Sequence, residues 1–300
     1  MKRVLLGMVA GLMLVPLATE RVGAQTSPLT FFKNYFITGD YTVGGTSLWR
    51  AGVNGRATRS FAMSGVPANA DILAAFLYVQ TAESVQWSGI DHASFNGNDL
   101  GAGSDSIAKA LNWEQATQPC WSVSWAGGRR LVTYRADVLR FLPLGADGKF
   151  AVNGLHTVSV PDVGAASSDL DELGFEPNPP NPSPRAIGAS LVVVYRDPSK
   201  PFRAVVIYDG GATKGAFNTM TQVLGGFYQA AATPAAKMTH IVGDGRPYFS
   251  ERVSVNGQVI ATNPYASVQG AKWDNPTFTN VPVTPGVGSV SVELSPNGLL

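Results

Sequence analysis

The chain has 300 residues, of which 14% are charged, and its formal net charge is +1. A balance this close to neutral gives no electrostatic reason to bind nucleic acid or an anionic lipid surface, so we expect neither as a partner. The hydrophobic content of 45% excludes a disordered chain, whereas 33 Gly and 20 Pro are typical of turn-rich β structure.

Residues 1–24 have the pattern of a secretory signal peptide. Lys2 and Arg3 precede an apolar stretch from Val4 to Ala18, and the small residues Gly23 and Ala24 mark a cleavage site. The apolar stretch is shorter than the ~20 residues that a membrane-spanning helix needs, and no later segment comes closer. We therefore predict cleavage after Ala24 and a secreted or cell-surface chain without a transmembrane segment. A buried N-terminal helix is the alternative.

Short runs rich in aromatic and β-branched residues alternate with Gly and Pro between residues 25 and 161, which predicts a first β-sandwich. The strand expected at 72–81 is apolar nearly throughout, so it belongs in the centre of a sheet. One short helix is expected at 107–115. The other strands are expected at 31–38, 39–43, 55–63, 92–95, 121–125, 131–134, 135–141, 149–152 and 156–160.

Five Asn-Gly pairs punctuate the chain, and they begin at Asn54, Asn96, Asn153, Asn256 and Asn297. Each stands beside a run in which apolar and polar residues alternate, and Asn-Gly is the favoured centre of a type I′ turn. We therefore predict a β-hairpin at each of the five pairs.

The composition changes at residues 162–186, where acidic residues and five prolines predict a loop or linker. Residues 187–300 form the predicted second β-sandwich. Its first two strands, at 189–195 and 202–208, are apolar on both faces, and we expect them to pair as a hairpin in mid-sheet. Later strands are expected at 221–228, 239–242, 252–255, 258–261, 277–283 and 289–294. The chain stops just after a strand and a turn, which leaves open a truncation of this unit at its C-terminus.

Residues 93–100 resemble residues 253–260, because both runs carry Asn-Gly between short apolar segments. Two related sandwich units would explain the likeness, and so would the independent use of the same turn chemistry. The sequence therefore predicts an all-β fold of one or two antiparallel β-sandwiches, jelly-roll-like or Ig-like, with little helix.

Six strand and turn segments have distinctive sequences, and they are 31–36, 38–41, 65–67, 134–138, 188–195 and 207–210. These segments resemble a family of uncharacterised secreted bacterial and archaeal β-sandwich proteins, which are found at the front of large multi-module surface proteins. The resemblance spans most of the chain after residue 24. It implies an extracellular β architecture and a surface role, and it carries no active-site residue.

Motifs that would carry catalysis are weak. Ser106 and Lys109 have Ser-x-x-Lys spacing, but the supporting Lys-Thr-Gly strand is missing, and no Gly-x-Ser-x-Gly elbow occurs. His92, His156 and His240 lie in separate strand-like segments without metal-ligand spacing. The acidic loops 96–105 and 169–176 contain oxygen ligands suited to Ca²⁺, although neither has a defined ligand spacing, and solvated loops are the simpler interpretation. We predict no enzyme, no catalytic residue and no bound cofactor.

Aromatic residues offer another candidate binding chemistry, although tryptophans that close the ends of the sandwich are the simpler interpretation. Trp49, Trp87 and Trp273 lie near turns and are the candidates for glycan contact, because an exposed ring stacks on a sugar. Trp121 and Trp125 alternate with serines in one strand and are expected to face the core. The single cysteine, Cys120, is interpreted as buried or as paired with a partner outside this sequence.

We therefore expect a non-catalytic extracellular module with a structural or adhesive role, whose partner is an extracellular protein or glycan. The alternative is a carbohydrate-binding module that uses loop aromatics. The third hypothesis is a glycan hydrolase with a dispersed carboxylate pair. A monomer is expected.

Overall fold

The computed structural model describes residues 25–26, 28–84, 89–111, 129–162, 184–212, 214, 218–230, 232, 236–245, 247 and 250–297. The predicted signal peptide, Trp87, Cys120, the strand expected at 121–125 and nearly all of the acidic loop lie outside the described residues. Within them, no helix has the length and apolar character that crossing a membrane requires.

The predicted all-β fold with antiparallel sheets is confirmed. The only helical elements in the described residues are two short 3₁₀ turns, η1 (Gly103–Asp105) and η3 (Leu139–Phe141). Among the named strands, β1 (Gln25–Thr26) and β13 (Met220–Leu224) form the one parallel pair. The helix expected at 107–115 is wrong where the structure describes it, because β8 (Lys109–Leu111) pairs with β9 (Arg129–Asp137).

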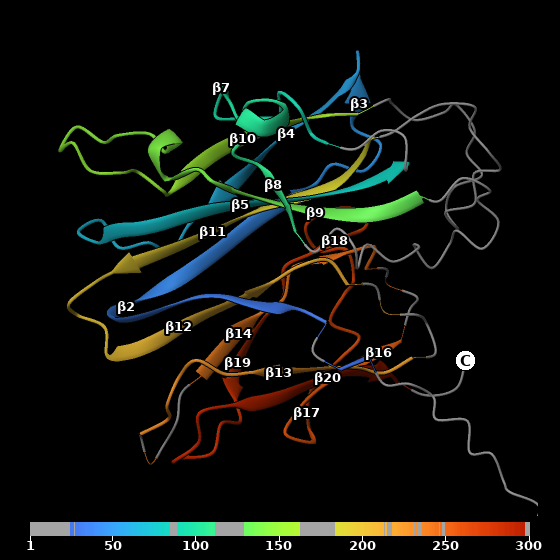
Figure 1. Cartoon of the computed structure of the whole chain (residues 1–300). Coiled ribbons are helices and arrows are strands. Elements are labelled where there is room, and N and C mark those ends of the chain that lie inside the picture. Colours follow the sequence, from blue (N-terminus) through green and yellow to red (C-terminus); the bar gives the residue numbers. More distant parts are fainter. Residues whose placement is uncertain are drawn as a thin grey trace, which may run out of the picture.

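The described residues between 30 and 209 form what we call the first region of the molecule. Two sheets face each other in it (Figure 1). The larger sheet has the order β12 (Phe202–Asp209), β2 (Thr30–Ser47), β11 (Arg185–Arg196), β5 (Asp71–Ser84), β9, β8. The smaller sheet has the order β3 (Gly52–Val53), β4 (Arg56–Met63), β10 (Gly154–Pro161), β6 (Ser94–Phe95), β7 (Asn98–Asp99).

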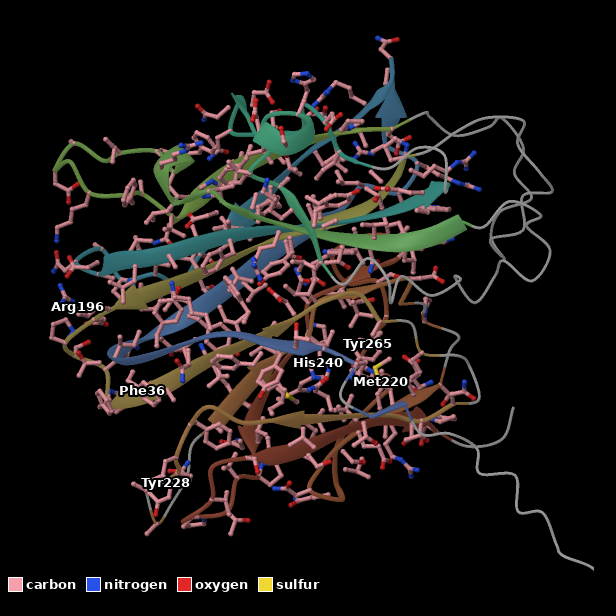
Figure 2. The ribbon with its side chains drawn as sticks, in the orientation of Figure 1. Phe36, Arg196, Met220, Tyr228, His240 and Tyr265 are labelled. Atoms are coloured by element: carbon pink, nitrogen blue, oxygen red, sulfur yellow. The ribbon has the colours of Figure 1, made fainter. Side chains whose placement is uncertain are left out.

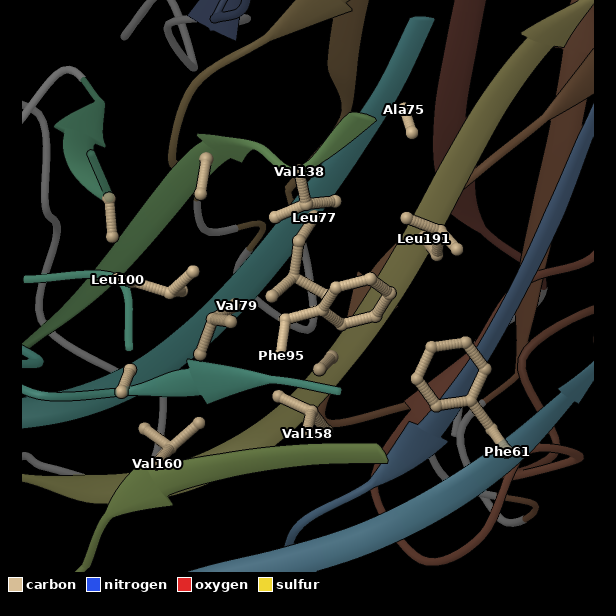
Figure 3. Close-up of a cluster of buried hydrophobic side chains, with 14 of the residues drawn as sticks. Phe61, Ala75, Leu77, Val79, Phe95, Leu100, Val138, Val158, Val160 and Leu191 are labelled. Atoms are coloured by element: carbon tan, nitrogen blue, oxygen red, sulfur yellow. The ribbon is translucent and has the colours of Figure 1, made fainter. Parts of the chain in front are cut away.

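The main hydrophobic core lies between these two sheets. Phe95 and Val158 from the smaller sheet meet Leu77 and Leu191 from the larger one, and all four are almost completely buried (Figure 3). On β10 buried residues alternate with more exposed ones, as expected for a strand with one face on the core and one face toward solvent. Strand β11 is buried on both faces, as its mostly apolar sequence indicates.

The hairpin predicted for the strands at 189–195 and 202–208 is wrong, because β2 lies between β11 and β12. Residues 39–47 of β2 pair with β11, and residues 30–38 pair with β12. Gly39 stands between these two halves, where a Cβ atom would clash with the carbonyl oxygen of Tyr195. Strands on both sides of residues 162–186 thus share one sheet, so the predicted boundaries of two sandwiches at 25–161 and 187–300 do not coincide with the sheets.

The first half of β2 (residues 30–38) and β12 form a two-stranded ribbon, called the β2–β12 ribbon below. Its inner side covers the face of the larger sheet that points away from the main core. The ring centroids of Phe32 in the ribbon and Phe76 in β5 are 5.1 Å apart. Figure 1 shows the ribbon between the two stacked sheets and the later strands of the chain.

The later strands, in residues 218–297, form the second region together with the short strand β1 from the start of the described chain. Its main sheet has the order β1 (Gln25–Thr26), β13 (Met220–Leu224), β20 (Val290–Pro296), β16 (Glu251–Val255), β17 (Gln258–Thr262). Two short ladders complete it, β14 (Ala236–Thr239) with β19 (Thr277–Val281) and β15 (Val242–Gly243) with β18 (Trp273–Asp274). Its core is smaller and contains Val253, Tyr265 and Phe278.

Three of the five predicted Asn-Gly hairpins are confirmed. Asn54, Asn96 and Asn256 each have a positive φ close to 50°, and each is followed by a glycine that also has positive φ, as a two-residue type I′ turn requires. The hairpin predicted at Asn153 is wrong, since its amide group bonds to both the N–H and the carbonyl of Val66 instead. The turn predicted at Asn297 reaches beyond the described residues.

Candidate functional site

The outer face of the β2–β12 ribbon exposes three phenylalanines to solvent. Phe31 is 49% exposed, Phe36 is 54% exposed and Phe202 is 68% exposed. Phe36 pairs with Ala204 and Phe202 pairs with Thr38, and cross-strand partners share a face of an antiparallel pair. Phe36 and Phe202 are therefore diagonal neighbours on one surface, which we call the Phe36–Phe202 patch.

A bulge in β2 directs its aromatic residues to both sides of the ribbon. The register shifts between Ile207 and Tyr208, which pair with Lys33 and Phe31, so that Phe32 is the extra residue. Phe31 faces outward beside Tyr208, with 5.7 Å between the ring centroids, whereas Phe32 faces inward to the buried cluster. A run of two phenylalanines thus serves both the core and the surface.

Polar contacts hold the ribbon to the larger sheet from beneath. The Tyr78 hydroxyl donates a hydrogen bond of 2.8 Å to Asp209 Oδ2, and Arg135 forms an ion pair with the same carboxylate. The Arg135 guanidinium also lies over the Phe32 ring, 3.4 Å from its centroid. Burial, followed by the charge of Asp209, raises the pKa of Tyr78. This hydroxyl therefore stays protonated and acts as a fixed donor.

A second network fixes the end of the ribbon where β2 bends. Asp40 Oδ2 lies 3.0 Å from Arg203 of β12, and Oδ1 lies 2.8 Å from Lys237 of β14. The Tyr41 hydroxyl lies 3.1 Å from Thr239 Oγ1, and burial raises the pKa of Tyr41 to about 12. Asp40 thus joins the bend of β2 to its partner strand and to the second region.

The loop after β13 closes the other end of the ribbon. Asn34 Nδ2 donates a 2.8 Å hydrogen bond to the carbonyl of Gly226, and Gly225 N–H donates one of 2.8 Å to the Tyr208 hydroxyl. Gly226 lies close to the Phe31 ring, because a Cβ atom there would come within 3.0 Å of Phe31 Cε2. Phe36 lies at the opposite end of the ribbon (Figure 2). The Phe36–Phe202 patch is thus an aromatic surface on a support that is anchored on three sides.

The structure separates the tryptophans that the sequence grouped as glycan contacts. The expectation that Trp273 is exposed is wrong, because its side chain is only 2% exposed and its indole N–H donates a 2.9 Å hydrogen bond to Ser190 Oγ. Trp49 is half-buried, and Lys272 Nζ lies 3.6 Å from the centroid of its ring. Trp87 lies outside the described residues, so it stays a prediction.

Ser106 and Lys109 each bond elsewhere. Ser106 Oγ donates to the carbonyl of Ala108 at 3.3 Å, and Lys109 Nζ donates to the carbonyl of Ser104 at 3.2 Å. The strand state of Lys109 also removes the helical turn that would bring the two side chains together. The pair is therefore not arranged as a nucleophile and its base in this structure.

The three histidines occupy unrelated places. His92 is in an exposed turn, where its Nδ1 lies 2.8 Å from Asp99 Oδ2 and lowers the pKa of that carboxyl. His156 is buried, and its Nε2 donates to the carbonyl of Val152 at 2.7 Å. His240 lies 2.7 Å from the Tyr265 hydroxyl, and burial lowers the pKa of His240 to about 4.

The acidic loop at 96–105, considered as a Ca²⁺ ligand, binds its own backbone. Asp99 Oδ1 accepts the N–H of Gly101, and Asp91 accepts the N–H of Gly103. Among the described residues, no three His, Cys, Asp or Glu side chains gather as a metal site. The loop expected at 169–176 lies outside the described residues.

The sequence did not single out two buried acidic sites or the Phe36–Phe202 patch. Glu83 is fully buried, and its Oε1 accepts hydrogen bonds from the hydroxyls of Tyr134 at 2.6 Å and Thr81 at 2.7 Å. Asp209 has the partners described above. An acidic residue at an inward position of an apolar strand was the available signal for both.

No protein-family model matches the chain, and no curated protein matches it. The role of the Phe36–Phe202 patch is therefore inferred from its own geometry.

Proposed function

We propose that the protein is a secreted, non-catalytic module of the extracellular space or cell surface, where it has an adhesive or structural role. It attaches to an extracellular partner through the Phe36–Phe202 patch. The export signal in residues 1–24 supports the location, and so does the resemblance of the strand segments to the front of bacterial and archaeal surface proteins.

The exposure of Phe36 and Phe202 on a firmly held ribbon is the observation that carries the proposal. Solvent-exposed rings that lie side by side lose apolar area from water when a partner covers them. Because the Asp40 and Asp209 networks already fix the ribbon, little ordering is needed on binding, which favours affinity.

The buried carboxylates support a structural rather than a catalytic role. Glu83 and Asp209 each accept a hydrogen bond from a tyrosine hydroxyl, and Asp209 also pairs with Arg135. Carboxylates engaged in this way hold the sheet together. The hydrolase hypothesis has no support from these two groups.

The carbohydrate-binding alternative in its original form depends on Trp49 and Trp87, because the Trp273 ring is buried. A cation already lies over the Trp49 ring, which occupies one of the faces that would stack on a sugar. The exposed phenylalanines are therefore better candidates for the contact surface than the tryptophans.

The test uses the protein without residues 1–24 and its Phe36→Ser/Phe202→Ser variant, applied as labelled proteins to washed cells of the producing organism. We expect binding that the double variant reduces about tenfold or more, because aromatic anchors dominate contact energies. The matched control is Leu155→Ser, which removes a side chain that is 74% exposed on β10, and it should bind normally.

Three outcomes would contradict the proposal: no binding to the cells, equal binding by the double variant, or retention of the intact leader inside the cell. Binding to a glycan array that is lost in Trp49→Ala or Trp87→Ala but kept in the double variant would favour the carbohydrate-binding module instead.

A further inference from the structure

Four Asn-Gly pairs have both residues described, and they differ in what holds the asparagine side chain. An Asn-Gly pair can modify itself, because glycine has no side chain to hinder attack by its backbone nitrogen on the asparagine amide carbon. The attack requires the amide group to rotate toward the backbone. Hydrogen bonds that fix the amide therefore oppose the reaction.

The amides of Asn96 and Asn256 are fixed by the same set of contacts. The backbone N–H of Asn96 donates to the carbonyl of Thr157, and Asn96 Oδ1 accepts the N–H of Thr157 at 3.0 Å. Asn256 has the same two bonds to Ser291. In both turns the amide nitrogen donates to a further carbonyl, that of Phe141 or of Pro282.

The neighbouring strand explains this arrangement. Strands β6 and β16 each have a second partner, β10 and β20, on the side away from their own hairpin. The side chain of the asparagine continues the hydrogen bonding to that partner strand, because its Oδ1 accepts one further backbone N–H from it. Asn153 is also fixed, by two bonds to the backbone of Val66 at 3.1 and 2.7 Å.

Asn54 occupies the same type of turn without such a neighbour. Strand β3 has only two residues and lies at the edge of its sheet, and the described residues provide no strand on its far side. Asn54 and Gly55 are both exposed, and within the described part of the chain no hydrogen bond engages the Asn54 amide. A hairpin arm of two residues also opens at little cost.

We propose that Asn54 is a site of spontaneous deamidation in the folded protein, whereas Asn96, Asn153 and Asn256 keep their amides. The deprotonated backbone nitrogen of Gly55 attacks Cγ of Asn54, a C–N bond forms, and the bond from Cγ to Nδ2 breaks with release of ammonia. Water then opens the cyclic imide at either carbonyl and yields aspartate or isoaspartate. The modification places a new carboxylate at the tip of the β3–β4 hairpin, two residues before Arg56.

The experiment incubates the folded, full-length secreted protein at mildly alkaline pH and maps its peptides by mass spectrometry over time. Conversion of amide to acid at Asn54 should be about tenfold or more faster than at Asn96 or Asn256. The amides of Asn96 and Asn256 must break two hydrogen bonds before they can rotate toward the backbone. Isoaspartate in the peptide that contains residue 54 identifies the cyclic imide route.

Two controls separate the fold from the dipeptide chemistry. In denaturant the four pairs should convert at similar rates, because the fixing contacts are lost. The variant Asn54→Asp should abolish the early release of ammonia from the folded protein. A folded-state rate at Asn96, Asn153 or Asn256 that equals or exceeds the rate at Asn54 would overturn the proposal, as would an unchanged amide at Asn54 while the denatured chain reacts.

Discussion

The first and second regions of the molecule build their cores in different ways. The first region encloses a core of aliphatic and aromatic side chains between two facing sheets, where Leu77, Phe95 and Leu191 are fully covered. The second region has a smaller core that includes Tyr265, whose hydroxyl is hydrogen-bonded to His240. Its largest buried side chain, Trp273, packs on the first region. The second region therefore depends on the first for part of its stability.

The two regions nevertheless share one local device, the Asn-Gly hairpin whose asparagine bonds to a neighbouring strand. The two regions thus use the same type of turn, although their cores are built differently. The likeness of residues 93–100 to residues 253–260 has a physical basis in these contacts, whether or not the two regions have a common origin.

Loss of the Trp273 side chain should have the largest effect on the junction of the two regions. The ring lies against Gly188, and its N–H donates to Ser190 Oγ, so Trp273→Ala leaves a cavity and removes one of the two hydrogen bonds of this buried hydroxyl, which still donates to Asn275 Oδ1. We expect a loss of about 3–5 kcal/mol in the free energy of unfolding, measured by urea denaturation. The matched control Trp49→Ala removes a half-exposed ring and should cost about 1 kcal/mol. Equal losses for the two variants would contradict the dependence of the second region on the first.

Acid should weaken the second region through His240. Its pKa is lowered from 6.5 to about 4 in the folded protein, so the unfolded chain binds the proton more readily between these values. The stability that the neutral ring contributes is complete above pH 6.5 and is lost as the pH falls through about 4. We expect a loss on the order of 2–3 kcal/mol over this range.

Chemical denaturation at a series of pH values measures this loss, and the variant His240→Gln should flatten the curve. Tyrosine fluorescence or NMR of Tyr265, the hydrogen-bond partner, reports the same titration locally. A wild-type curve that matches the variant across the whole range would show that His240 is not the responsible group.

The shared hairpin device should give the smallest effect, and it can be tested at three matched turns. Glycine keeps the positive φ and removes the side-chain hydrogen bonds, so Asn96→Gly and Asn256→Gly should each cost about 1–2 kcal/mol. Asn54→Gly should change the unfolding free energy by less than about 0.5 kcal/mol, because the Asn54 amide bonds to nothing in the described part of the chain. Differential scanning calorimetry compares the three, and a loss at Asn54 as large as at Asn96 would remove the distinction.

Local patterns were sufficient for part of this structure. The aromatic and β-branched runs predicted strands, and Asn-Gly predicted the turns at Asn54, Asn96 and Asn256, because backbone sterics restrict these conformations residue by residue. The same rule failed at Asn153, where two hydrogen bonds to the distant Val66 outweighed the turn preference.

Strand pairing and the candidate surface depended on contacts between residues far apart in the chain. The apolar strands β11 and β12 are sequence neighbours, yet β2 lies between them. One half of this long strand pairs with β11 and the other half with β12, and Gly39 stands where the halves meet, because a Cβ atom there would clash with Tyr195. This pairing places Phe36 beside Phe202 on an exposed face, whereas the packing of the second region on the larger sheet buries Trp273 against Gly188. The alternation along a strand says which residues share a side, but only the assembled sheets determine which side meets water, because burial depends on the layers that pack above and below.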